Sequence, residues 1–192
     1  MNINPSVATR GLTNNGILAT GVSVSEVSVT TSNSAAVDLN ASADGNFSFS
    51  SLSVNGGANG ILIQNTGANF NFTVTGSGTT PGSGGTIQNT TNRGASFIST
   101  RNISLSNMNF TNTATVAGAP CGSAAVVGAH TGCNAAIHLD TVNTAAFNQL
   151  SITTSGQQGI NGIDVTNFTL SSSTLSGLGN GPDEDGLHFH NM

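Results

Sequence analysis

The sequence predicts an all-β fold, a solenoid of short parallel strands with about 23 residues in each basic coil. Three observations predict it: an apolar spacing that recurs along the chain, an abundance of turn-forming residues, and very little charge. Gly, Asn, Thr and Ser together make up 99 of the 192 residues, and charged residues make up 6%. Such a composition disfavours a helix bundle, which needs Ala, Leu, Glu and Lys.

The recurring spacing reads apolar, polar, apolar, two other residues, apolar, polar, apolar. Alternation with period two indicates a strand. The alternation shifts by one residue between the two pairs. This shift indicates a bend in the chain, after which the apolar side chains again point inward. The blocks with this spacing, the third of them shortened, are Val22–Val29, Phe47–Val54, Phe70–Val74, Ile103–Phe110, Ala145–Ile152 and Phe168–Leu175.

A second short strand is predicted upstream of most blocks, often directly after a Gly such as Gly60 or Gly159. Each coil therefore offers two or three strands, and each strand pairs with its counterpart in the next coil. The predicted upstream strands are Val37–Leu39, Ile61–Ile63, Ile137–Leu139, Ile160–Gly162 and Leu187–Phe189.

The inward positions of these strands predict the core. Val, Ile, Leu and Phe fit a buried pleated surface, while outward Ser, Thr and Asn can form hydrogen-bonded ladders. The residues expected to form inward stacks are Val22, Val24, Phe47, Phe49, Phe70, Phe72, Leu105, Met108, Phe147, Leu150, Phe168 and Leu170.

The intervals between blocks define the expected domain organisation. We expect residues 1–15 to form an N-terminal arm or cap, and residues 16–192 to form the coils. Two longer intervals predict loop insertions near 76–93 and 112–134. No signal-peptide pattern follows Met1, and the last residues lie in a predicted strand, so we interpret the chain as a piece of a longer protein.

Three stretches, Gly84–Asn89, Arg101–Phe110 and Asp183–Gly186, carry a resemblance to a known family. Over roughly residues 16–191 the chain resembles the right-handed parallel β-helix repeats of large bacterial secreted and surface proteins, including autotransporter-type and haemagglutinin-type adhesins. The resemblance implies a single-stranded, right-handed helix, as the general crossover rule also does. It implies an extracellular or cell-surface location. It does not imply one activity, because polysaccharide lyases, phage tailspikes and adhesins share this coil.

Cys121 and Cys133 bracket a Gly- and Ala-rich loop within the second insertion. Two cysteines placed in this way predict a disulfide, which would restrict the loop and belongs in an oxidising compartment. The alternative is a pair of reduced thiols.

Acidic and histidine residues gather near the C-terminus, where Asp183 and Asp185 precede His188 and His190. With Leu187 and Phe189 inward, both imidazoles are expected to point outward. Alignment of the coils places His188 in one column with Asn161 and His138, and His190 in another with Ile163 and Asp140. Asp183, Asp185, His188 and His190 are weak candidates for a metal site, with Ca²⁺ as the ion, although the calcium-loop spacings are absent. The favoured interpretation is a solvated turn with two exposed imidazoles, no metal and no cofactor.

Composition excludes several functions. Three Arg and no Lys against eight acids cannot neutralise a nucleic acid or an anionic membrane surface. No apolar run approaches the roughly 20 residues that a membrane helix needs. The acids Glu26, Asp38, Asp44, Asp140 and Asp164 fall on different coils, so no catalytic residues are assigned.

The leading hypothesis is a non-catalytic, structural and adhesive segment of a secreted or surface protein. Its expected partners are surface glycans, other cell-surface proteins, and other copies of itself stacked end to end into fibres. The first alternative is a carbohydrate-active enzyme, a polysaccharide lyase or glycosidase, which the fold analogy suggests. A second, less favoured alternative is ice binding, because flat ladders of Thr and Ser can order water, but a regular Thr-x-Thr stack is missing.

Overall fold

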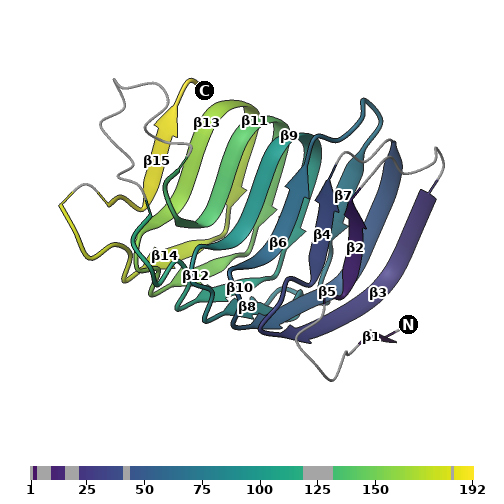
Figure 1. Cartoon of the computed structure of the whole chain (residues 1–192), viewed down its shortest axis with the longest axis horizontal. Coiled ribbons are helices and arrows are strands. Elements are labelled where there is room, and N and C mark those ends of the chain that lie inside the picture. Colours follow the sequence, from purple (N-terminus) through teal and green to yellow (C-terminus); the bar gives the residue numbers. More distant parts are fainter. Residues whose placement is uncertain (1, 4–9, 16–21, 41–43, 119–131, 183) are drawn as a thin grey trace.

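The structure is a computed structural model that describes residues 2–3, 10–15, 22–40, 44–118, 132–182 and 184–192. The regular structure in these ranges is entirely β: fifteen strands are present and no helix. Accordingly, the described residues include no helix long and apolar enough to cross a membrane. All described strand pairs are parallel, and the strands form one 15-stranded sheet that winds through three rows (Figure 1).

The first row contains the predicted upstream strands, now in register with one another. Val37 pairs with Ile61, Ile61 with Ala95, and Ala95 with Ile137, so each repeat adds one strand beside the previous one. The row consists of β2 (Leu12–Asn15), β4 (Val37–Asn40), β6 (Asn59–Gln64), the first parts of β9 (Arg93–Ser106), β11 (Ala135–Asn148) and β13 (Gln158–Ser171), and β15 (Leu187–His190).

The second and third rows follow the recurring apolar blocks. The second row consists of the first parts of β3 (Val22–Ser32) and β5 (Gly45–Asn55), then β7 (Asn71–Val74) and the later parts of β9, β11 and β13. The third row consists of the later parts of β3 and β5, then β8 (Thr86–Gln88), β10 (Asn109–Thr111), β12 (Ser151–Thr153) and β14 (Thr174–Ser176). The short strand β1 (Asn2–Ile3) pairs with β3.

Residues with positive φ make the bends between rows. The predicted slips between Leu105 and Met108 and between Phe147 and Leu150 are confirmed as bends: Asn107 has φ 58° and Gln149 has φ 53°. Two further bends divide the long strands. They lie at Ser99, Thr141 and Asp164, with φ 48°, 56° and 51°, and three residues later at Asn102, Thr144 and Asn167.

The predicted core is confirmed where its side chains are described. Phe47, Phe49, Phe70, Phe72, Leu105, Met108, Phe147 and Leu150 are buried. Val24, Phe168 and Leu170 are partly buried and pack against this core, and the side chain of Val22 lies outside the described part. Phenylalanine rings contact one another from repeat to repeat, with centroids 5.5 Å apart for Phe49 and Phe72 and 5.7 Å for Phe147 and Phe168. The core is therefore one continuous stack.

Two strands lie where the sequence suggested other structure. β2 falls within the predicted N-terminal arm, and β8 falls within the predicted insertion at 76–93. Each strand carries a single apolar residue in its column: Leu12 pairs with Val37, and Ile87 pairs with Val54. A single apolar residue cannot show an alternation of apolar and polar residues, so the sequence did not predict these two strands. Part of the second insertion, 119–131, lies outside the described residues.

Candidate functional site

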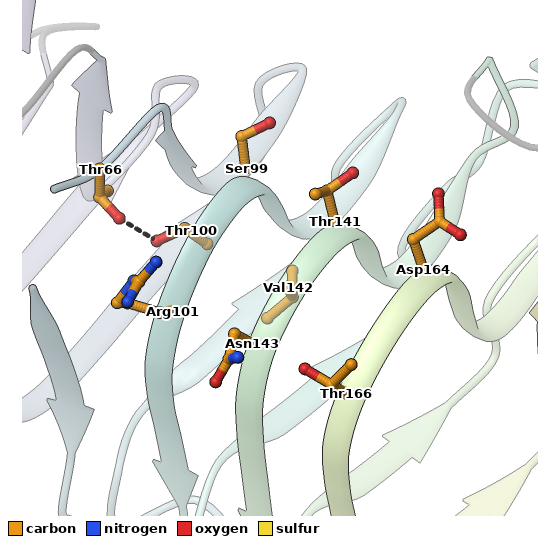
Figure 2. Close-up of a pocket in the computed structure, with 9 residues that line it drawn as sticks. All are labelled: Thr66, Ser99, Thr100, Arg101, Thr141, Val142, Asn143, Asp164 and Thr166. Atoms are coloured by element: carbon orange, nitrogen blue, oxygen red, sulfur yellow. Dashed lines mark hydrogen bonds between the residues drawn. The ribbon is translucent and has the colours of Figure 1, made fainter. Parts of the chain in front are cut away.

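A polar groove lies at the bend between the first and second rows, on β9, β11 and β13 (Figure 2). Its volume is about 370 Å³. We name it the bend groove and define it by its lining residues, which are Thr66, Ser99, Thr100, Arg101, Thr141, Val142, Asn143, Asp164 and Thr166.

Strand register arranges the polar side chains of the bend groove in two parallel lines. Arg101, Asn143 and Thr166 are partners on adjacent strands and form one line. Ser99, Thr141 and Asp164, the positive-φ residues of the first bend, form the other (Figure 2). Neighbouring strands lie about 4.8 Å apart, so each line repeats at that interval. The bend groove therefore presents a regular array rather than an isolated cluster.

The floor of the bend groove is fixed by packing and hydrogen bonding. Val142 and Thr100 are buried. The hydroxyls of Thr66 and Thr100 lie 2.7 Å apart and share a hydrogen bond, which ties the segment after β6 to β9. Because the residues beneath the polar side chains are held in place, few side chains would have to lose conformational freedom when a ligand binds.

One cation and one anion line the bend groove, on different strands. The Arg101 guanidinium donates through Nη1 to the carbonyl of Ala68 at 3.3 Å. Asp164 Oδ1 accepts a hydrogen bond of 2.8 Å from Asn191 Nδ2. Both contacts anchor one side of the charged group and orient it.

Asp44 organises the loop that carries Ala68. Its two carboxylate oxygens accept hydrogen bonds of 2.7 Å from the backbone N–H and from the side-chain amide of Asn69. The backbone bond, then the side-chain bond, and to a lesser extent the charge of Arg101 hold the pKa of Asp44 below its ordinary value of 3.8. Asp44 therefore stays ionised and supports the Arg101 end of the groove.

The hollow continues past Asp164. A second depression, of about 330 Å³, is lined by Asp164, Val165, Thr166, Asn191 and Met192, and so shares Asp164 and Thr166 with the bend groove. The two depressions run across successive strands, along the direction in which the repeats stack. A ligand that extends in this direction meets a polar or charged side chain of each line at each strand.

Two acids lie on neighbouring strands, as the alignment of Asp140 with Ile163 in the sequence predicted. Asp140 pairs with Ile163, so Asp140 and Asp164 lie on neighbouring strands, one residue apart in register. Asp164 lines the bend groove, whereas Asp140 does not. Instead, Asp140 Oδ1 accepts a 2.9 Å hydrogen bond from the hydroxyl of Thr141.

The structure brings together only part of the predicted C-terminal set. His188 Nδ1 lies 2.9 Å from Asp185 Oδ2, and His190 is half-buried in register with Ile163. Asp183 lies outside the described residues. Within the described ranges, no three side chains of His, Cys, Asp or Glu are placed to hold a metal ion.

The expectation that both imidazoles are exposed is wrong for His188. The predicted column is confirmed, since His138 pairs with Asn161 and Asn161 with His188. However, His138 and Asn161 are 0% exposed, His188 is 9% exposed, and Asn161 Nδ2 lies 3.0 Å from His138 Nδ1. Leu187 was expected to point inward, but on β15, the last strand of the described first row, it is 48% exposed.

Segments next to the strands cover this outward column. Arg93 donates to the hydroxyl of Ser96 at 3.0 Å and to the carbonyl of Cys133 at 3.2 and 3.3 Å. The residues before β11 therefore lie over the column at one end, while Asp185 contacts His188 at the other. Burial lowers the pKa of Arg93, which the nearby Asp140 partly offsets. The alternation of apolar and polar residues in the sequence predicts on which face of a strand a residue lies. It does not predict which segments pack against that face.

Cys133 is buried, and the described part of the chain contains no free cysteine. Cys121 lies outside the described residues, so the bond between these two cysteines stays a prediction.

The bend groove was not predicted from the sequence, although alignment of the coils places Arg101, Asn143 and Thr166 in one column. Comparison of the chain with protein-family models, with curated proteins and with solved structures finds no match.

Proposed function

We propose that the chain is a single-stranded, right-handed parallel β-helix segment of an extracellular surface or secreted protein, with a structural and adhesive role. Parallel pairing of residues 23 apart, such as His138 with Asn161, supports the solenoid. The continuous buried stack supports rigidity. The handedness and the location follow from the sequence resemblance.

The observation that carries the adhesive role is the double line of side chains in the bend groove. Thr, Ser and Asn side chains both donate and accept hydrogen bonds, as the hydroxyl groups of sugars do. Spacing at every strand suits a ligand built from repeating units, and the volume of about 370 Å³ lies within the usual range for small-ligand sites. Surface glycans are therefore the ligand class that this groove fits.

A glycan array with the purified protein tests this proposal, followed by calorimetry on the best ligand. Asn143→Ala removes the central side chain of one line, and we expect a loss of affinity of about fivefold to tenfold, as for one hydrogen bond. Thr174→Ala is the matched control, because Thr174 is an exposed polar residue on the third row. Absence of glycan binding, or an equal loss in both variants, would overturn the proposal.

The neighbouring positions of Asp140 and Asp164 favour one second candidate, a carbohydrate-active enzyme. Paired carboxylates are the groups that cleave glycosidic bonds. The hydrogen bond from Thr141 to Asp140 argues for a structural carboxylate instead. Incubation with pectins, alginates and host glycans, with product detection, separates the two. Turnover that disappears in Asp140→Asn or Asp164→Asn would establish the enzyme.

A further inference from the structure

The two charged groups of the bend groove differ in what they leave available for a ligand. A guanidinium has five N–H donors, and Arg101 uses Nη1 for the carbonyl of Ala68. The side chain is half-buried and lines the groove. A planar fork of this kind binds a carboxylate through two parallel hydrogen bonds.

Besides Asp44, which supports the loop that Arg101 contacts, further negative charge lies on the far side of the groove. Asp164 is two strands away from Arg101, about 10 Å at the usual strand spacing, and its Oδ1 is held by Asn191. Asp140 lies on the strand between them, one residue out of register with Asp164. A ligand carboxylate at this end would meet like charge, whereas a neutral sugar could donate its hydroxyls to Asp164.

Between the charged groups the lining is neutral. Thr141, Asn143 and Thr166 supply hydroxyl and amide groups only. The groove therefore has one end that attracts an anion, a neutral middle, and one end that repels an anion. This order gives a bound chain a direction.

Assuming the glycan-binding role proposed above, we propose that the bend groove selects glycans with a single carboxylate on the terminal sugar, which Arg101 binds, while Asp164 excludes chains with acids on successive sugars. The neutral sugars next to the terminal acid lie along Asn143 and Thr166. Glycans ending in sialic acid and glycans ending in a uronic acid share this chemistry.

Binding of four soluble ligands to the full chain tests the selection: an oligosaccharide ending in sialic acid, one ending in glucuronic acid, their neutral parent without the acid, and an oligogalacturonate. We expect at least one terminal-acid ligand to bind about tenfold or more tightly than the neutral parent. We expect the oligogalacturonate to bind no better than the neutral parent. The first two ligands distinguish the source of the carboxylate.

Three variants assign the effect to its residues. Arg101→Gln should lower the affinity for the terminal-acid ligands to that for the neutral parent measured with the same variant, while Arg101→Lys should keep part of the preference. Asp164→Asn should raise affinity for the oligogalacturonate relative to that for the terminal-acid ligand, both measured with the same variant. Rising salt should weaken the acid ligand and not the neutral one. Thermal unfolding of each variant checks that it is folded.

The outcomes separate this inference from the proposed function. Equal affinity for acid and neutral ligands, or an acid preference that survives Arg101→Gln in a folded variant, overturns the selection while glycan binding stands. Tight binding of oligogalacturonate by the unmodified protein also overturns it. Absence of binding to every glycan overturns both.

Discussion

Phe49 shows how a single residue ties neighbouring repeats together. It is fully buried, pairs in register with Val27 and Val74, and its ring centroid lies 5.5 Å from that of Phe72. Phe49→Ala should lower the free energy of unfolding by about 3–5 kcal/mol, because neighbours on both sides hold the cavity open. Urea unfolding measures the change. Ser48→Ala, at the outward neighbouring position, is the control and should stay within about 0.5 kcal/mol.

Asp44 makes stability depend on pH in a defined direction. Its pKa is lowered in the folded chain, so its contribution is present above the ordinary value of 3.8 and is lost as the pH falls through the lowered value. Asp44→Asn should therefore be less stable than the unmodified protein at neutral pH and equal to it in strong acid. Unfolding midpoints of both proteins across the acid range measure this. A difference that persists unchanged in strong acid would contradict the role of the carboxylate.

At the residue scale, the sequence predicted the position of a residue in the strand register better than it predicted what surrounds that residue in the fold. The column of His138, Asn161 and His188 followed from aligning the coils, because period two assigns each residue to one side of its strand. The burial of that column did not follow, because it depends on segments outside the strands: the residues before β11, whose Cys133 carbonyl Arg93 contacts, and Asp185, which contacts His188. The bend groove was missed for a different reason: aligning the coils places Arg101, Asn143 and Thr166 in one column, but the alignment does not show that the chain is hollowed there.

At the scale of the elements, the bends decide how the chain turns, and they were predicted only where they shift the apolar pattern. The slip at Asn107 and Gln149 was visible because an inward residue moves by one position. Only two residues lie between the bends at Ser99 and Asn102. A segment of two residues is too short to show an alternation of apolar and polar residues, so these bends could not be predicted. Asn suits such positions, because it tolerates positive φ better than other non-glycine residues.

Thr144 is the exception within its column. Its register partners Asn102 and Asn167 both have positive φ, and Thr144 itself has φ 70° although it is β-branched. Thr144→Asn should raise the free energy of unfolding by about 1 kcal/mol, because strain at this bend is relieved. Its hydroxyl bond to Asn143, 3.0 Å long, is the interaction lost.

Denaturant unfolding measures this gain, with Ala146→Asn as the control. Ala146 is half-buried on the same strand, just beyond the bend, so Asn there gains nothing from the backbone and should be neutral or destabilising. A loss of stability in Thr144→Asn as large as in the control would show that the bend is not strained.

At the scale of the whole molecule, stacking of repeats leaves the last complete repeat less covered than the others. Leu170 is partly exposed, whereas its register partner Phe147 is 1% exposed; Leu175 is partly exposed, whereas Ile152 is fully buried. Within the described residues, β15 pairs only with Ile160–Ile163 in the first part of β13, so no described strand pairs with the later part of β13 on that side. Apolar side chains beside an open strand edge favour pairing with another chain.

We expect a second copy to pack on this face, because the first described repeat carries Val24 and Val27 in the same inward columns. A net charge of −5 over 192 residues gives little repulsion. We therefore expect the protein to associate head to tail as its concentration rises. Such contacts need not close into a ring, so the expected products are filaments.

Sedimentation velocity and electron microscopy across a concentration series measure this association. Leu175→Lys should shift association to higher concentration, whereas Val116→Lys, at an exposed position of the insertion, should not. A protein that stays monomeric at every concentration, or two variants that behave alike, would contradict stacking through this face.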